Sequence, residues 1–339
     1  MEYSAVAPAC QRKPHRLHGP DMVWKQKNCY VDLWIELLHG WGLDPHAALP
    51  FTVAQDFEGD QFTFFKIPFE DLETLYGIVV QEHAIYESVL SHAVTQVARG
   101  RVMLIEVDAW YLPDTQGISY GRQHVKTTIG IDRIDLLNRR VGYFHNTGYY
   151  ELEGEDFAGI FDHRAHSMTN ATLPPYVECV KRVMPALPEV LLREVSLGLF
   201  IRHLRRVPDL SPIAAFRRAL AGDAQRLVDQ PPEFFHGYSF NTVRQMGANF
   251  ELLGHYLRWI DMQRPSHVEP LGPLVDACQK LASESMVLEF RLARSAARSR
   301  VDRGESCLDI LEASYDIVIN GLHRNFGMPA AKLASEAAA

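Results

Sequence analysis

A single cysteine, Cys29, lies in the stretch WKQKNCYVD, directly before a strongly apolar segment. In the first turn of a helix, unpaired backbone N–H groups and the positive end of the helix dipole stabilise a thiolate. Nucleophilic chemistry at such a thiol also needs a nearby base and a third group that orients the base. Cys29 is therefore a candidate nucleophile, and the alternative is a small core residue on an apolar helix.

His124 and Asn146 are the candidate partners of Cys29. His124 opens the alternating stretch HVKTTIGI and Asn146 ends the stretch VGYFHN, so both are expected at strand ends. Neighbouring antiparallel strands can bring the start of one strand beside the end of the next. The pattern predicts a triad of these three residues, and the alternatives are a hydrogen-bonded sheet histidine and a turn asparagine.

Acidic side chains supply further candidates. Glu58 and Asp60 in DFEGDQ are candidates for binding a substrate amine, and the alternative is an acidic turn. Asp108 lies on a predicted strand, where a carboxylate needs a partner. We expect Asp108 either to line the site or to pair with Arg122 or Lys126.

Arginines mark the second half of the chain. Arg244 lies on a predicted helix, and the stretch LEFRLARSAAR spaces Arg291, Arg294 and Arg298 along one helix face. Guanidinium groups bind carboxylates and phosphates with two hydrogen bonds at once. These arginines are predicted to recognise an acidic partner or a phosphate, and the alternative is a solvated helix surface.

Metal and nucleotide sites are weakly indicated. The stretch DHRAH offers His163 and His166 at a spacing that can share a metal, yet no complete zinc motif accompanies them. The sequence contains no glycine loop of the kind that cradles phosphates. We therefore expect neither a bound metal nor a tightly bound cofactor.

Composition limits the class of protein. The chain has 339 residues and a net charge of −8, with 14 Lys and Arg against 24 Asp and Glu in residues 1–180. Residues 181–330 hold 19 basic against 17 acidic side chains, and 17 of the 19 are arginine. No part of the chain has the strongly basic charge that is typical of nucleic-acid-binding proteins. No apolar run is long enough for a transmembrane helix, and the N-terminal residues do not resemble a signal peptide. We therefore expect a cytoplasmic protein, and because the five cysteines are odd in number and scattered, we expect no disulfide framework.

The periodicities divide the chain into parts. Residues 1–20 are polar and irregular and are expected to form a flexible arm, as are residues 331–339 at the other end. Between residues 21 and 180 we expect an α+β domain. It would contain a buried helix from Cys29, a strand over 61–69, helices over 70–77 and 86–100, and an antiparallel sheet over 101–112, 124–134 and 139–146. Residues 181–330 show long helical periodicities and are expected to form an all-α domain, with helices near 186–206, 212–228, 239–262, 271–300 and 306–325.

The order of these features resembles the papain-like cysteine peptidase fold. A cysteine opens a buried helix, and the strand RVMLIEVDAWYLP, a strand that begins with histidine and a strand that ends in Asn follow it. The NC pair and the VD-x-x-YLP pattern resemble the family of the N-terminal domain of butirosin-biosynthesis acyltransferase H. The chain as a whole, especially NCYVDLWIELLHG, FEGDQFTFFK and YFHNTGYYEL, resembles the bacterial family called domain of unknown function 1839.

The papain-like resemblance implies roles for individual residues. Cys29 matches the nucleophile, His124 the general base and acid, and Asn146 the orienting third member, where bacterial relatives commonly have Asp. The fold usually places a Gln before the cysteine as an oxyanion donor. Gln26 is the nearby glutamine, and Asn28 is its rival.

The family resemblances also imply a reaction. They favour a cysteine-dependent acyltransferase that takes an acyl group, expected to be aminoacyl, from the 4'-phosphopantetheine thioester of a carrier protein. The group would pass through acyl-Cys29 to a small-molecule or peptide amine, because the second family is linked to amino acid:carrier-protein ligases. The alternatives are a papain-like peptidase or amidase and a non-catalytic carrier-binding scaffold. We expect no nucleic-acid or membrane partner, and a homodimer remains an open alternative.

Overall fold

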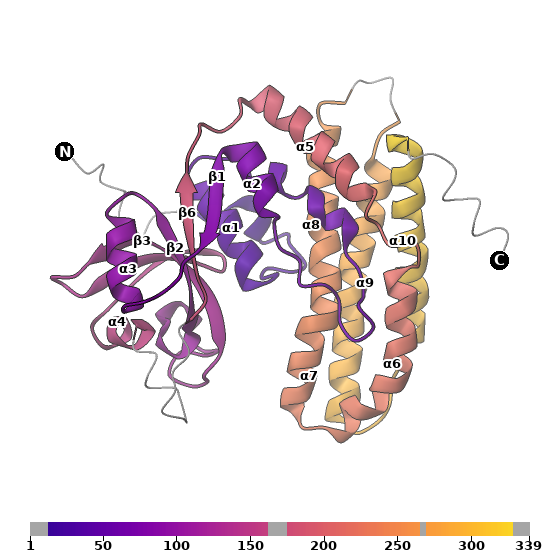
Figure 1. Cartoon of the computed structure of the whole chain (residues 1–339). Helices are drawn as coiled ribbons and strands as arrows, with labels where there is room; N and C mark the ends of the chain where they lie inside the picture. The colour runs from indigo at the N-terminus through magenta and orange to yellow at the C-terminus, as the bar shows by residue number, and fades with distance from the viewer. Residues whose placement is uncertain (1–12, 162–174, 265–268, 328–339) are drawn as a thin grey trace. The chain divides into compact units, whose positions relative to one another are not determined.

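The computed structural model of the protein describes residues 13–161, 175–264 and 269–327 (Figure 1). These residues form a mixed α and β structure, which divides into two compact units. Unit 1 is formed by the chain up to residue 19, by residues 28–45 and by residues 69–187. Unit 2 is formed by residues 20–27, by residues 46–68 and by the chain from residue 188 onward.

A six-stranded antiparallel sheet organises unit 1. Its spatial order is β1-β6-β2-β3-β4-β5. The strands are β1 (Ile78–Glu82), β2 (Val102–Asp108), β3 (Lys126–Asp135), β4 (Arg140–His145), β5 (Gly148–Glu153) and β6 (Val177–Arg182). Every strand pair is antiparallel, and the β3–β4 register shifts between Ile131 and Arg133. The central strands carry apolar side chains on both faces, so layers of helix cover the sheet on both sides.

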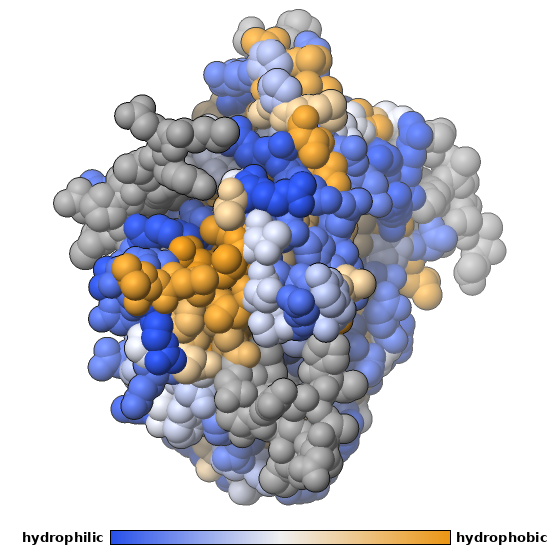
Figure 2. Space-filling view, turned by 60° about the vertical axis from the view of Figure 1, so that its left-hand side comes forward, coloured by the Kyte–Doolittle hydropathy of each residue, from blue (hydrophilic) through white to orange (hydrophobic). Residues whose placement is uncertain are grey.

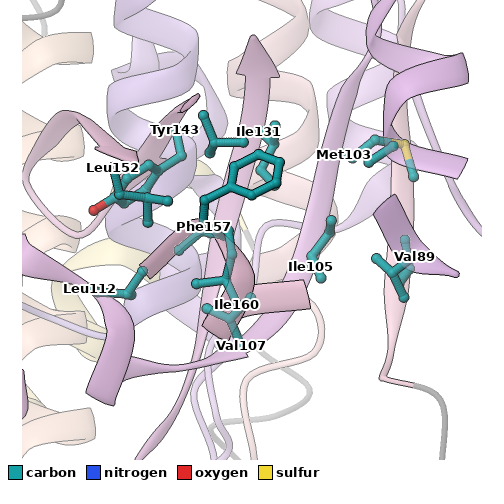
Figure 3. Close-up of a cluster of buried hydrophobic side chains, with 14 of the residues drawn as sticks. Val89, Met103, Ile105, Val107, Leu112, Ile131, Tyr143, Leu152, Phe157 and Ile160 are labelled. Carbon is teal, nitrogen blue, oxygen red and sulfur yellow. The ribbon is translucent and has the colours of Figure 1, made fainter. Parts of the chain in front are cut away.

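One face of the sheet carries a continuous apolar core. It is covered by α3 (Val89–Val97) and α4 (Gly154–Phe161). Figure 3 shows side chains of both helices gathered with strand residues that include Met103, Ile105 and Tyr143. Because Met103, Ile105 and Val107 alternate with Leu104, Glu106 and Asp108 along β2, the second set of side chains points to the opposite face.

The opposite face carries the helix α1 (Cys29–Gly40). A Cβ added at Gly130 of β3 would lie 3.1 Å from Leu104 and 3.5 Å from Leu33 of α1. Leu104 and Leu33 therefore approach β3 from the same side, and a glycine in β3 lets the helix pack closely on the sheet. The α1 face of the sheet is thus the face that also displays Asp108.

The sequence of α1 sets both of its ends. The side chain of Asn28 caps the first turn by accepting a hydrogen bond from the Val31 N–H at 2.9 Å. Gly42 adopts φ +72°, and Leu43 N–H donates to the Leu38 carbonyl at 2.9 Å, which closes the helix as a Schellman motif. The predicted helix from Cys29 to the HGWG stretch is confirmed.

Six helices form most of unit 2. They are α5 (Glu189–Leu204), α6 (Pro212–Asp229), α7 (Pro232–Ser239), α8 (Gln245–Asp261), α9 (Gly272–Ala297) and α10 (Glu305–Phe326). The long helices α8, α9 and α10 lie side by side (Figure 1). Residues 240–244 form one π-helical turn between α7 and α8. The helical second half that the sequence predicts is confirmed.

The segment Pro20–Lys27 belongs to unit 2 and is fixed to α8. The buried Glu251 carboxylate accepts hydrogen bonds from the N–H groups of Val23 at 2.7 Å and Trp24 at 2.9 Å. A Cβ at Gly247 would lie 2.5 Å from the indole nitrogen of Trp24, so only glycine permits this close approach. Burial raises the pKa of Glu251.

Several local expectations need correction. The strand predicted over 61–69 is wrong, because this part of the chain has no strand partner beyond an isolated bridge between Phe57 and Phe62. Phe62 of this stretch packs instead within unit 2, where it meets Phe216 of α6 and Phe57. The helix predicted over 70–77 is confirmed as α2 (Phe69–Tyr76), and the one over 86–100 is confirmed in part as α3. Strands β1, β5 and β6 and helices α4 and α7 were not predicted.

The predicted domain ends are only partly visible. Of the arm over 1–20, residues 13–19 lie in unit 1 and residue 20 begins a unit 2 segment, whereas residues 1–12 lie outside the described part. Residues 331–339 also lie outside it.

No helix in the described ranges has the length and apolar character to cross a membrane. The face drawn in Figure 2 is mainly polar, and its most extensive apolar area lies on the left of the view.

Candidate active site

Cys29 is the first residue of α1 and is half-buried. Its position in the first turn is the one in which backbone N–H groups stabilise a thiolate. Among the described residues the thiol forms neither a disulfide nor a hydrogen bond. Cys179 and Cys278 are fully buried, and burial raises the pKa of each of these two thiols. Cys29 is therefore the more accessible thiol of the three.

Asp108 and His124 form a hydrogen-bonded pair at one end of β2 and β3. Nδ1 of His124 lies 2.6 Å from Oδ2 of Asp108. The indole of Trp110 stacks on the imidazole with ring centroids 4.5 Å apart and planes 11° apart. The His124 side chain is 62% exposed and the Asp108 side chain 15%, so the imidazole is open to solvent.

The second oxygen of Asp108 fixes the carboxylate itself. Oδ1 accepts hydrogen bonds from the N–H groups of Trp110 at 2.9 Å and Val125 at 3.2 Å. In a neutral imidazole whose Nδ1 donates to a carboxylate, the lone pair lies on Nε2. Asp108 therefore orients His124 and selects the tautomer that can accept a proton at Nε2. Lys126 pairs instead with Glu106 at 2.7 Å, and Arg122 donates to the Gly117 carbonyl.

Asn146 occupies a different place from the one the triad pattern needs. Gly130 pairs with Phe144, so continuing this register places Asn146 across from Thr128. His124 lies four residues further along, a distance of about 13 Å along a strand. Asn146 adopts φ +45° in the β4–β5 turn, and its amide lies 3.4 Å from Nδ1 of the neighbouring His145. The carboxylate of Asp108, and not the amide of Asn146, is the side chain that contacts His124.

His145 belongs to a buried polar cluster that sequence reasoning missed. Its Nδ1 lies 2.6 Å from Asp114, and its Nε2 lies 2.8 Å from the hydroxyl of Thr127. The hydroxyl of Tyr143 donates to the other oxygen of Asp114 at 2.6 Å. Burial and the adjacent Asp114 carboxylate raise the pKa of Tyr143. Thr127 pairs with Val107, so this cluster lies on the face opposite α1.

The first turn of α1 is anchored to β6 by a buried carboxylate. The Tyr30 hydroxyl donates to Glu178 at 2.6 Å, and the Tyr176 hydroxyl donates to the other oxygen at 2.9 Å. Glu178 of β6 lies directly opposite Leu104 of β2 in the strand register, so its side chain points to the α1 face. Burial and the Glu178 carboxylate raise the pKa of Tyr30. This contact fixes the residue next to Cys29 against the sheet.

A second buried charge cluster joins the N-terminal segment to α1. The imidazole of His18 lies between two α1 carboxylates, 2.9 Å from Asp32 and 2.5 Å from Glu36. Both carboxylates are buried. Asp32 and Glu36 follow each other at i, i+4 on an otherwise apolar helix, a pattern that requires a polar partner. That pattern could have indicated that α1 needs a polar partner such as His18. From the sequence alone, His18 is expected in a flexible arm.

The remaining candidates lie in or beside unit 2. Gln26 is exposed in the segment Pro20–Lys27, whereas Asn28 uses its side-chain oxygen as the cap of α1. Glu58 and Asp60 are exposed in a turn closed by the Glu58 N–H and the Gln61 carbonyl, as in the acidic-turn alternative.

The structure describes Arg244 but not the two histidines of the DHRAH stretch. The guanidinium of Arg244 lies over the rings of Trp24, 5.9 Å away, and Phe240, 5.7 Å away, so its contacts are packing contacts within unit 2. His163 and His166 lie outside the described residues.

Family comparison agrees with the division into a sheet-bearing part and a helical part. The DUF1839 N-terminal domain matches residues 13–182, and the DUF1839 C-terminal domain matches residues 189–324. The chain belongs to the DUF1839 family. The two DUF1839 matches meet between β6 and α5. A comparison with curated proteins gives no match.

Proposed function

We propose that this DUF1839 protein is a cysteine-dependent acyltransferase, with Cys29 as nucleophile, His124 as base and Asp108 as the group that orients the base. The observation that carries the proposal is the 2.6 Å Asp108–His124 hydrogen bond, on the sheet face that also carries the helix opened by Cys29. A nucleophile helix packed on an antiparallel sheet is the arrangement of the papain-like fold. The orienting role that the sequence assigned to Asn146 passes to Asp108.

The proposed chemistry runs through two acyl transfers. Nε2 of His124 takes the proton of the Cys29 thiol, and the thiolate attacks the carbonyl carbon of a thioester. The bond from the carbonyl to the donor sulfur breaks, and the released thiolate takes the proton from the imidazolium. An amine then attacks acyl-Cys29, gives its proton to His124 and forms an amide as the Cys29 thiolate leaves. Exchange between two thiols has a small driving force, so the donor thioester supplies the free energy for the amide.

The acyl donor in this proposal is the 4'-phosphopantetheine arm of an acyl or aminoacyl carrier protein. Support comes from the family resemblance and from the arginine-rich composition of residues 181–330, which suits an acidic protein partner. Transfer to water in place of an amine would make the protein a peptidase or amidase. A protein that holds the carrier without accepting the acyl group would be a scaffold.

Mass spectrometry of the protein after incubation with an aminoacyl-loaded carrier tests the proposal. We expect an aminoacyl adduct on the peptide that contains Cys29, and no adduct in Cys29→Ala. His124→Gln should slow adduct formation by roughly 10²–10⁴-fold, the usual contribution of a general base. His39→Gln, which removes an exposed imidazole from α1, is the matched control and should leave the rate unchanged.

The outcomes separate the three functions. An adduct that persists until an amine is added supports acyl transfer. An adduct that is lost equally fast with and without the amine is being hydrolysed by water and indicates a hydrolase. Carrier that is retained on the protein without any adduct indicates a scaffold and refutes the catalytic proposal. Asp108→Asn should lower the rate of adduct formation while Asn146→Ala has little effect, and the reverse ranking would return the orienting role to Asn146.

A further inference from the structure

A cavity of 640 Å³ in unit 2 lies where α9 ends and the chain turns into α10. Five arginines and one carboxylate are among its lining residues, namely Arg291, Arg294, Arg298, Arg300, Arg303 and Asp302. No aromatic side chain of the described residues lines it. The lining therefore combines a high positive charge with a volume typical of small-molecule sites.

Among the described residues, four of these five guanidinium groups have no hydrogen-bonded or ion-paired partner. Arg291 forms a paired contact with Asp302, from Nη2 at 2.9 Å and Nε at 3.0 Å. Within the described residues, the guanidinium groups of Arg294, Arg298, Arg300 and Arg303 make no hydrogen bond and no ion pair. Like charges gathered in this way repel one another, and an anion in the cavity would relieve that repulsion.

The loop that carries Arg300 and Arg303 is fixed by hydrogen bonds to its own backbone and to α9. The Ser295 hydroxyl donates to the Arg300 carbonyl at 2.7 Å and accepts from the Asp302 N–H at 3.0 Å. Asp302 also accepts from the Gly304 N–H at 2.9 Å. Arg291 holds the pKa of Asp302 below its usual value, so the carboxylate stays ionised and keeps the loop in place. The arginines are thus presented on a preorganised backbone.

Stabilisation of the helix end explains only part of the cluster. Cations near a helix C-terminus interact favourably with its dipole, and Arg294 and Arg298 lie in the last turn and at the C-cap of α9. Arg300 and Arg303 lie beyond the helix, in the loop before α10. Their convergence on the same cavity needs another explanation, and a bound anion provides one.

We propose that this cavity binds a small ligand through a diphosphate group. One phosphate would not match a lining with five guanidinium groups and a single carboxylate, whereas two linked phosphates offer enough oxygens for several bidentate contacts. Since the described lining has no aromatic side chain for stacking on a base, the diphosphate and not a nucleobase is the recognised part. This site is independent of the proposed acyl transfer at Cys29.

Calorimetric titration of the full chain with sodium pyrophosphate at 0.15 M salt tests the site. We expect saturable binding, with at least tenfold weaker binding of orthophosphate. The double variant Arg298→Gln and Arg300→Gln should weaken pyrophosphate binding at least tenfold. Arg218→Gln is the matched control, because Arg218 is exposed on α6 without a hydrogen bond or ion pair among the described residues, and it should bind like the wild type.

Parallel titrations with ADP and coenzyme A identify the source of the diphosphate. Binding that is tighter than that of pyrophosphate, and lost in the double variant, supports the site and names the larger ligand. Equal binding of sulfate and pyrophosphate at matched ionic strength would overturn the proposal, as would unchanged binding in a double variant whose circular dichroism and melting temperature match the wild type. Capture of an acidic protein without any pyrophosphate binding would also overturn it.

Discussion

Replacing Tyr30 with phenylalanine removes one hydroxyl from the contact between α1 and β6 and leaves the ring in place. Tyr30 is 3% exposed and Glu178 is 1% exposed, so water cannot replace the lost donor. A hydrogen bond to a charged group contributes about 1.5–3 kcal/mol, and we expect the free energy of unfolding to fall by that amount. For a unit of this size the melting temperature should fall by roughly 3–12 °C.

Urea unfolding followed by circular dichroism, with unchanged m-value, measures the effect. Tyr176→Phe is the matched control, because it removes the other hydroxyl from Glu178 at a residue that is 40% exposed, and it should be the milder change. In a Glu178→Gln background the loss from Tyr30→Phe should shrink, since the charged acceptor is gone. A loss below about 0.5 kcal/mol, under the range of such hydrogen bonds, or a larger loss in Tyr176→Phe, would refute the anchor.

Three further predictions concern packing and charge. Gly130→Ala places a Cβ 3.1 Å from Leu104 under α1 and should lower the free energy of unfolding by about 1–3 kcal/mol, measured by urea unfolding. Glu251→Gln sets an amide NH₂ against one of two backbone N–H donors and should remove about 1–3 kcal/mol in the same assay; an unchanged midpoint would contradict either expectation. Because Arg291 lowers the pKa of Asp302, the stability advantage of the wild type over Asp302→Asn should be complete well above the ordinary pKa of 3.8 and disappear as the pH falls through the lower folded-state pKa. Melting temperatures across pH 2–7 give the sign, and an advantage that grows in acid would contradict it.

Local patterns were sufficient where neighbours in sequence decide the structure. The apolar run after Cys29, the cap at Asn28 and the glycines after Leu38 define α1 without reference to the rest of the chain. The alternating strands around residues 102–145 and the long helical periodicities after residue 188 were likewise readable. The strand predicted over 61–69 failed because alternation alone does not supply a partner strand.

The site depended on contacts that are distant in sequence. Asp108 was one of several candidates, and Lys126 lies directly across from it in the β2–β3 register. The side-chain contacts nevertheless pair Asp108 with His124 and Lys126 with Glu106. The same sheet assigns Asn146 to a turn beside His145. A register is fixed by the whole set of strand pairs, so a strand's own residues cannot reveal it.

The sequence by itself determined that this protein has a cysteine at the tip of a buried helix, strand ends rich in polar side chains, and a helical second half with many arginines. These features follow from side-chain chemistry and from periodicities of 3.6 and 2 residues, which are local. The tertiary structure alone decided which carboxylate holds His124, which imidazole is buried between Asp32 and Glu36, and that five arginines converge on one cavity. Such choices arise from long-range packing and strand register, in which each residue's partner is set by the rest of the fold.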